Sequence, residues 1–443
     1  MSTPAVPTAI LALGEQFCRG LQALGSGSVD ASLADLEAAV LQLLRGLAPQ
    51  ALALAVRTTQ RSLGPARAKR PVACPRCGSA TRVASWRSRT LLTTCGPLNF
   101  ERPWHHCAAC RHGFSPTDAS LALCPGQRIS PALVEQVTAV GATTSFREAT
   151  DLLGQLTGIT LHPETVRRVT EATGAALEAA EQAVVQRVAA TREPAAPPDP
   201  APGRLVVETD GVMVRYRDGW HEVKVGLAAG WENGKLRAPS YTAARLDAGR
   251  FGLRLLALAA HRGALEVVAW EGSPLQRRLA RLRPVVVLGD GAHWIWDLAA
   301  EQFGERTEVV DWYHASEHVW AAAKALCGEG DAARRWAEDR LAELWDGGAA
   351  SVVAALARAH PSSEEANAVV RRERGYFTAN AERMAYAALR TQGLPCGSGG
   401  VESSAKHLVQ QRLKRAGSRW SEPGAQALLT LRCHRASRRA HAA

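Results

Sequence analysis

The sequence lacks several features that would assign its class at once. It has no run of about 18 uncharged apolar residues, so we expect no membrane span. Its opening stretch carries Glu15 and no basic region ahead of an apolar run, so we expect no secretory signal. Disulfide-stabilised secreted domains are therefore disfavoured, and we expect a cytoplasmic protein.

Acidic residues are too few to balance the basic ones. The chain has 42 Asp and Glu against 53 Lys and Arg, a formal net charge of +11. Such an excess favours a polyanionic partner, and nucleic acid is the natural candidate. Much of it lies in a C-terminal stretch whose only acidic residue is Glu422: Lys406, Arg412, Lys414, Arg415, Arg419, Arg432, Arg435, Arg438 and Arg439. A solvated helix face with a frayed tail is the ordinary alternative.

Cysteine is scarce, with 10 residues in 443, yet four of them form two close pairs. Cys74-Pro-Arg-Cys77 and Cys107-Ala-Ala-Cys110 supply the four thiolates of a tetrahedral structural Zn²⁺ site. The residues at 81–84 and 91–94 predict a strand pair that brings the two cysteine pairs together. The alternatives are disulfides or chance thiols. Nearby residues could substitute as ligands, although none is needed: Cys95, His105, His106, His112 and Cys124.

The residues around the cysteine pairs have helical periodicity. Asp30 precedes Leu, Val and Ala at helical spacing, and the N-terminal arm is predicted to be two helices. Beyond the cysteines, a helix opens at Ser130, and a second has one apolar stripe that ends at Gly158. The stripe comprises Phe146, Ala149, Leu152, Leu153 and Leu156. Pro163 suits the first turn of a third helix that carries Arg167 and Arg168. This pattern resembles a DNA-reading helix-turn-helix, or any pair of packed helices.

A Pro-rich segment at 191–203 breaks all periodicity and is read as a stiff linker and domain boundary. Beyond it the pattern becomes extended. Two hairpin-like strands begin at Arg204 and His221, and a third lies near 240–246. Two short apolar strands, at 284–289 and 307–310, each lead into a helix. We therefore expect a mixed α/β sheet covered by helices.

Three acidic residues stand at unusual places in this pattern. Asp210 interrupts a β-branched strand, Asp290 ends a buried strand, and each is followed by Gly. Carboxylates beside glycine at strand ends can hold divalent cations against a phosphate, although Asp-Gly is also a common turn dipeptide. Glu402 follows a Gly-rich stretch in the first turn of a helix, where it could simply pair with Lys406.

Three stretches that contain these residues carry a resemblance. They occur in this order: Leu288-Gly-Asp-Gly-Ala-His-Trp-Ile-Trp, Val310-Asp-Trp-Tyr-His-Ala-Ser-Glu-His-Val-Trp and Gly397-Ser-Gly-Gly-Val-Glu-Ser, the last followed by the basic residues from Arg412 onward. The chain resembles the ISKra-type family of bacterial insertion-sequence transposases, which is similar to the Mutator-like DDE recombinases. Cys396 departs from the aliphatic residue expected before Gly-Ser-Gly.

The resemblance implies a domain plan. An N-terminal helical arm (1–68), a zinc-ribbon-like module (69–127), a helix-turn-helix-like DNA-binding region (128–190) and the linker (191–203) precede an RNase H-like catalytic domain. That domain would comprise 204–326 and 394–443, the latter with the last helix and a basic tail, interrupted by an all-helical insertion at 327–393.

The resemblance also implies a chemistry. Asp210, Asp290 and Glu402 would hold two Mg²⁺ or Mn²⁺ ions, with His314 near the reacting phosphate. The enzyme would cut element ends and join their 3′-OH groups to target DNA. Phosphate contacts are expected from Arg167, Arg168, Lys406, Arg412, Lys414, Arg415 and Arg419.

The resemblance leaves the partners and the reaction partly open. Partners would be double-stranded DNA, in terminal inverted repeats and target, and a second copy of the chain, in the bacterial nucleoid. An inactive DNA-binding descendant, or an RNase H-like nuclease that does not join strands, remains open.

Overall fold

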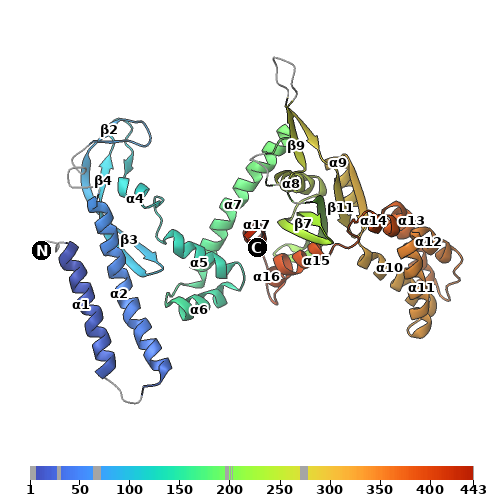
Figure 1. Cartoon of the computed structure of the whole chain (residues 1–443), viewed down its shortest axis with the longest axis horizontal. Coiled ribbons are helices and arrows are strands. Elements are labelled where there is room, and N and C mark those ends of the chain that lie inside the picture. The colour runs from blue at the N-terminus through green and yellow to red at the C-terminus, as the bar shows by residue number, and fades with distance from the viewer. Residues whose placement is uncertain are drawn as a thin grey trace. The chain divides into compact units, whose positions relative to one another are not determined.

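A computed structural model describes residues 6–26, 31–62, 71–194, 199, 201, 203–269 and 278–442. The chain divides into two compact units, Met1–Val169 and Thr170–Ala443, which are described separately (Figure 1). The division falls inside helix α7 (Pro163–Thr191), whereas the sequence pattern places a boundary at 191–203. Most of that Pro-rich segment lies outside the described residues.

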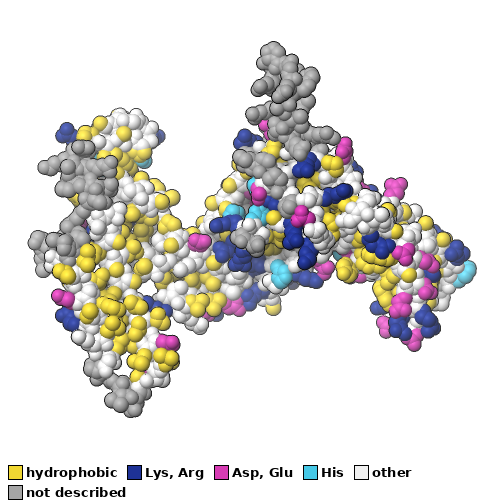
Figure 2. Space-filling model, in the orientation of Figure 1, with side chains coloured by type: hydrophobic (Ala, Val, Ile, Leu, Met, Phe, Trp, Pro, Cys, Tyr) yellow, Lys and Arg dark blue, Asp and Glu magenta, His cyan; other side chains and the backbone are white. Residues whose placement is uncertain are grey.

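The N-terminal arm is two helices, as predicted: α1 (Val6–Ser26) and α2 (Leu33–Ser62). Asp30, the expected cap of the second helix, lies outside the described residues. Ser32 and Asp35 cap α2 instead, because Asp35 N donates to Ser32 Oγ and Ser32 N donates to the Asp35 carboxylate. Both helices expose large apolar side chains, and Figure 2 shows them gathered over α1 and α2: Ile10, Leu11, Leu21, Leu33, Leu36, Leu41 and Leu44.

One described helix tests the expectation of no membrane span. By length and composition, the segment Leu33–Thr59 of α2 would be able to cross a bilayer. That test alone assigns no span, because core helices pass it too. The segment also contains Asp35, Glu37, Arg45 and Arg57, and Pro49 lies inside the helix.

The cysteine module is built on a long hairpin. Strand β3 (Val83–Thr93) pairs antiparallel with β4 (Gly96–His106), and β4 pairs with β5 (Gly113–Phe114). Strands β1 (Val72–Ala73) and β2 (Ala80–Thr81) form a second short sheet, and α4 spans Pro116–Ser120. The predicted pairing of 81–84 with 91–94 is therefore wrong, because most of 81–94 is one strand, β3, whose partner is β4.

Three helices follow, as the sequence predicts: α5 (Pro131–Gly141), α6 (Phe146–Thr157) and α7. Ser145 and Glu148 form a capping box at the start of α6, and Gly158 ends it with a left-handed φ of 75°. The predicted apolar stripe is only partly correct. Ala149 and Leu153 are buried, whereas Leu156 is 73% exposed because it lies on the outer side of the helix.

The second unit is built on a five-stranded mixed sheet with the order β12-β11-β6-β7-β8. Strands β6 (Arg204–Tyr216), β7 (Gly219–Glu232) and β8 (Lys235–Ala244) are antiparallel neighbours. Strands β11 (Val285–Gly289) and β12 (Arg306–Val310) run parallel to each other, and β11 runs parallel to β6. A separate hairpin joins β9 (Leu265–Ala269) and β10 (Arg278–Leu282). The mixed sheet predicted from the sequence is confirmed.

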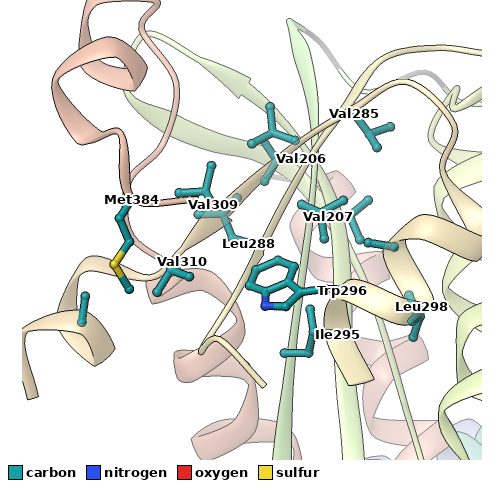
Figure 3. Close-up of a cluster of buried hydrophobic side chains, with 14 of the residues drawn as sticks. Val206, Val207, Val285, Leu288, Ile295, Trp296, Leu298, Val309, Val310 and Met384 are labelled. Atoms are coloured by element: carbon teal, nitrogen blue, oxygen red, sulfur yellow. The ribbon is translucent and has the colours of Figure 1, made fainter. Parts of the chain in front are cut away.

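Helices α8 (Ala248–His261), α9 (His293–Gln302) and α10 (Trp312–Cys327) connect or follow these strands. Val207, Leu288, Trp296 and Val309 belong to the core that they enclose with the sheet (Figure 3). The region predicted as helical contains α11 (Asp331–Gly347), α12 (Ala349–Ala357), α13 (Glu364–Ala379), a 3-10 turn (Ala381–Met384) and α14 (Tyr386–Thr391).

The chain returns to the sheet after α14. Helix α15 (Gly399–Ser404) runs through a π-helical turn (Ala405–Gln410) into α16 (Gln411–Leu413), and α17 (Glu422–Ala442) packs against β8.

A buried arginine ties α7, α8 and α17 to the sheet. Arg254 on α8 is 1% exposed and donates to Glu178 at 2.7 and 2.8 Å and to Thr242 at 2.7 Å. It also lies 2.8 Å from Glu181 and 3.3 Å from Thr430 on α17. Burial opposes ionisation of Glu178, but the hydrogen bond and charge of Arg254 outweigh it and lower the pKa of Glu178 to about 2.

We expect Arg254→Ala to lower the free energy of unfolding of this unit by about 3 to 5 kcal/mol, because it removes a buried cation and leaves two half-buried carboxylates, Glu178 and Glu181, without their partner. The matched control is Arg250→Ala on the same helix. Arg250 is 77% exposed and pairs only with Asp247, so its loss should cost about 0.5 kcal/mol or less. Urea denaturation of both variants measures the difference, and equal losses would contradict this account.

Candidate metal and phosphodiester sites

The four paired cysteines meet in one place. Their Sγ atoms all lie within 4.8 Å of one another, with Cys74 to Cys110 at 3.6 Å and Cys77 to Cys107 at 3.5 Å. Zn–S bonds of about 2.3 Å set tetrahedral S···S edges of about 3.8 Å, so the cluster fits one such ion. The prediction that four cysteines suffice without histidine is therefore supported. None of the ten cysteines forms a disulfide.

Each cysteine pair sits in the same backbone turn. Gly78 N donates to Cys74 O at 2.9 Å, and Arg111 N donates to Cys107 O at 2.8 Å. Gly78 and Arg111 both have left-handed φ angles, of 76° and 58°. The β3–β4 hairpin aligns the two turns, because Val83 pairs with His105 just beyond them. His105 is buried and lies 3.1 Å from Thr81 Oγ1, so it packs beneath the module and is no ligand.

The surface of this module combines basic and aromatic side chains, a composition typical of nucleic-acid-binding surfaces, and the sequence analysis missed it. Arg87 lies 4.4 Å and Arg102 5.3 Å from the Trp104 ring, and Trp86 is exposed on the same hairpin. A hollow of about 900 Å³ lies beside them, with Asp118 between Arg89 and Arg102 at 2.7 and 2.8 Å. Alternation of basic and aromatic residues along one hairpin was the available signal.

In the second unit, strand register places Asp210 and Asp290 side by side. Leu288 of β11 pairs with Glu208 of β6, so the residue two beyond each is at the same level and on the same face. Gly211 N donates to Asp210 Oδ1 at 2.7 Å, and Ala292 N donates to Asp290 Oδ1 at 2.8 Å. The Asp-Gly turn therefore exists only at Asp290. Asp210 does not interrupt its strand, because Asp210 and Gly211 lie within β6 and pair with β7.

Glu402 and His314 lie within electrostatic reach of Asp210. Burial raises the pKa of Asp210, and the negative charges of Asp290 and Glu402 raise it further, while Gly211 N and His314 lower it. Among the described residues, only the cysteines bring three or more ligand atoms within 4.8 Å of one another. The three carboxylates are therefore spread more widely than the ligands of a single ion.

Glu402 is held near the sheet by a carboxylate that the sequence analysis missed. Glu208, two residues before Asp210, is buried and accepts from Val401 N at 2.7 Å and from Gly400 N. Burial raises the pKa of Glu208 to about 8, although these two backbone donors lower it.

Asp311 holds the same Gly-rich segment from the other side. Its carboxylate accepts from Ser398 N, from Ser398 Oγ at 2.8 Å and from His314 N at 2.9 Å. Burial opposes ionisation, but bonds from His314 and Ser398 outweigh it and lower the pKa of Asp311. His314 Nδ1 lies 3.2 Å from Asp311 Oδ1, and this hydrogen bond raises the pKa of His314 to about 9. We call Glu208 and Asp311 the carboxylate clamp.

The expected DNA contacts differ in accessibility. Arg412 is wrong as a phosphate contact, because it is 2% exposed and lies 4.8 Å from the Trp420 ring. Lys406 is exposed but pairs with Glu402 at 2.6 Å, the ordinary helix ion pair. Arg167 pairs with Glu164 across one turn. Arg168, Lys414 and Arg419 are exposed, and Arg415 is half-buried.

Two tryptophans of the second unit pack in or against its core. Trp296 is buried and donates to Asn380 Oδ1 at 3.0 Å. Trp312 packs edge-on against Trp345 and Tyr386.

We expect Cys74→Ser combined with Cys107→Ser to abolish zinc binding and unfold the cysteine module, because the metal supplies much of the folding energy of such small modules. Wild-type protein should carry one zinc per chain by elemental analysis. Cys18→Ser, remote from the cluster, is the control and should keep its zinc. Zinc retained in the double variant would contradict this assignment.

Two neighbouring glycines test the carboxylate clamp. A Cβ on Gly400 would lie 2.4 Å from Leu236 and 2.8 Å from Glu208 Oε2, so Gly400→Ala should displace the segment that carries Glu402 and destabilise the unit by about 1 to 3 kcal/mol. A Cβ on Gly399 meets nothing within 4 Å. Gly399→Ala should therefore be neutral or slightly stabilising in thermal unfolding. Equal thermal unfolding of the two variants would contradict the close approach of Gly400 to Glu208 and Leu236.

Comparison with known proteins adds one family. Residues 30–237 match an uncharacterised protein family (UPF0236), which is less than half of the chain. The match includes the cysteine pairs and Asp210 but ends before Asp290, His314 and Glu402. No curated protein matches the sequence.

Proposed function

We propose that the chain is a DDE-type DNA transposase of a bacterial insertion sequence, which binds element ends and catalyses strand cleavage and 3′-OH strand transfer. The observation that carries the proposal is that Asp210, within β6, and Asp290, directly after the parallel neighbour β11, fall at one level when the strand register is extended by two residues. The charge of Glu402 also acts on Asp210, although Glu402 is remote from it in sequence. Partly buried carboxylates that repel one another are what bound cations stabilise.

The donor set fits Mg²⁺ or Mn²⁺, because all three side chains offer hard oxygen ligands. Asp210 would be shared between two ions, with Asp290 and Glu402 each holding one. Two ions about 3.5–4 Å apart need ligands spread more widely than one ion does. When bound, the ions would supply charge neutralisation and activation of the attacking oxygen.

In the proposed reaction, water attacks a phosphodiester at the element end and the bond from phosphorus to O3′ breaks. The freed 3′-OH then attacks a phosphodiester of target DNA, and a second P–O3′ bond breaks. The chain's residues position the participants. The carboxylate clamp fixes the helix of Glu402, and cationic His314 can donate to a phosphate oxygen from Nε2 while Asp311 holds Nδ1.

The sheet order supports an RNase H-like reading of the catalytic domain. Three antiparallel strands are followed by two parallel ones with helices between them, and a helical region separates the last strand from the helix of Glu402. These elements correspond to the domain plan that the family resemblance implies.

DNA recognition would fall to the first unit and to exposed basic residues. The cysteine module and helices α5 to α7 would bind terminal inverted repeats, and Figure 2 shows Lys and Arg side chains gathered over the region of α16 and α17. A homodimer or higher oligomer is expected because two element ends must be joined. Such a protein would act in the cytoplasm, on the nucleoid.

We expect Asp210→Ala, Asp290→Ala and Glu402→Ala each to reduce cleavage of a labelled duplex carrying the DNA that flanks the gene by at least about 1,000-fold in Mg²⁺ or Mn²⁺, while DNA affinity changes little. The control is Asp297→Ala, an exposed acid on α9. Retained cleavage in a variant removes that residue from the site.

The same assay separates the alternatives. Cleavage without joined products would favour a nuclease, and binding without cleavage would favour an inactive descendant.

A further inference from the structure

Helix α10 carries a second oriented histidine, one turn after His314. His318 Nδ1 lies 2.5 Å from Oε2 of Glu373 on α13, and the Glu373 side chain is 0% exposed. Arg372 donates to Oε1 of the same carboxylate at 2.9 and 2.5 Å. Burial opposes ionisation of Glu373, but hydrogen bonds from His318 and Arg372 outweigh it and lower its pKa. A buried carboxylate thus holds two basic side chains at the surface.

The imidazole plane of His318 is fixed by Tyr376. The two rings stack with centroids 3.6 Å apart and an interplanar angle of 21°. Tyr376 Oη donates to the backbone oxygen of Asp290 at 2.8 Å. A Cβ on Gly291 would lie 2.6 Å from the Tyr376 ring, so glycine permits this approach. The Tyr376 side chain therefore bridges the His318 ring and the loop that carries Asp290.

This geometry leaves one nitrogen of His318 for a ligand. Glu373 occupies Nδ1, and the side chain is 32% exposed, so Nε2 is the atom that can face outward. A ring that carries both protons donates from both nitrogens, and an anion placed beside Nε2 favours that form. Exposed Glu317 stands on the same helix between the two histidines, so the face carries one negative charge as well.

The ligand chemistry favours an anion over a metal ion. Among the described residues, no group of three ligand side chains that includes His318 converges within 4.8 Å. Two basic groups held on one buried carboxylate, each with donors to spare, suit a phosphate oxygen.

We propose that His318 is a DNA-binding residue that donates from Nε2 to a non-bridging phosphate oxygen of the strand lying beside Asp290. This rests on the proposed function, since it takes DNA as the substrate. Glu373 and Tyr376 are positioning residues that hold the imidazole toward that phosphate. The helical region thereby contributes directly to substrate binding, in addition to packing on the sheet.

The test is the salt dependence of binding to a fluorescein-labelled DNA duplex, measured by anisotropy without divalent cations so that no cleavage occurs. Loss of one phosphate contact lowers the slope of log affinity against log salt by about 0.9. We expect this for His318→Gln. His318→Lys, which restores a cation, should keep the wild-type slope, a rescue that a purely structural role would not give. His360→Gln, an exposed histidine of the same helical region, is the control and should change nothing.

A wild-type slope in folded His318→Gln, or equal losses in the Gln and Lys variants, overturns the proposal. If His318→Gln does not fold, ¹⁵N-histidine spectra of the wild type decide. The Nε2 resonance of His318 is assigned as the one absent from the spectrum of His318→Lys. In the wild type it should shift when DNA is added, and an unchanged resonance counts against the contact. A full shift with inorganic phosphate at the same ionic strength would indicate a free-phosphate site instead. A reduced slope in a protein that never cleaves DNA would keep this contact and reject the transposase.

Discussion

The candidate site of the second unit depends on the hydrogen bonds that two buried carboxylates accept from the Gly-rich segment before Glu402. Glu208 binds the amides of Gly400 and Val401, and Asp311 binds the amide and hydroxyl of Ser398. A buried carboxylate without donors would be very costly, so these bonds fix where the segment can lie. Since Glu402 follows directly, its distance from Asp210 is set by backbone contacts of its neighbours.

Two carboxylates link the two histidines to the rest of the unit. Asp311 directly follows β12, caps α10 and orients His314. One turn later His318 contacts α13, whose Tyr376 reaches back to Asp290. The two adjacent strand ends therefore each bind a helix, and the helical region is fixed to these strand ends by polar contacts as well as by apolar packing.

Much of this arrangement could be predicted from sequence. The Cys-x-x-Cys pairs indicated the thiolate cluster, and short apolar strands followed by helices indicated the mixed sheet. Two limits were physical. Glu208 and Asp210 lie two residues apart on one strand, whose pattern does not say which acid is buried, and the partners of Glu208 are remote amides that carry no side-chain signal. Arg412 has the composition of a phosphate contact, but Trp420 covers it, and burial of an arginine is invisible in a count of charges. Leu156 was predicted to belong to the apolar stripe but is exposed, because helical spacing alone does not show where the buried face of a helix ends.

One hydrogen bond of the clamp joins residues that are synthesised far apart in time. Glu208 and its partner Val401 are 193 positions apart. At translation rates of about 5–20 residues per second, the carboxylate waits about 10 to 40 s after its own synthesis before that amide emerges. During that interval Glu208 lacks this donor, so the segment that carries Glu402 cannot take its native position until almost all of the chain has left the ribosome.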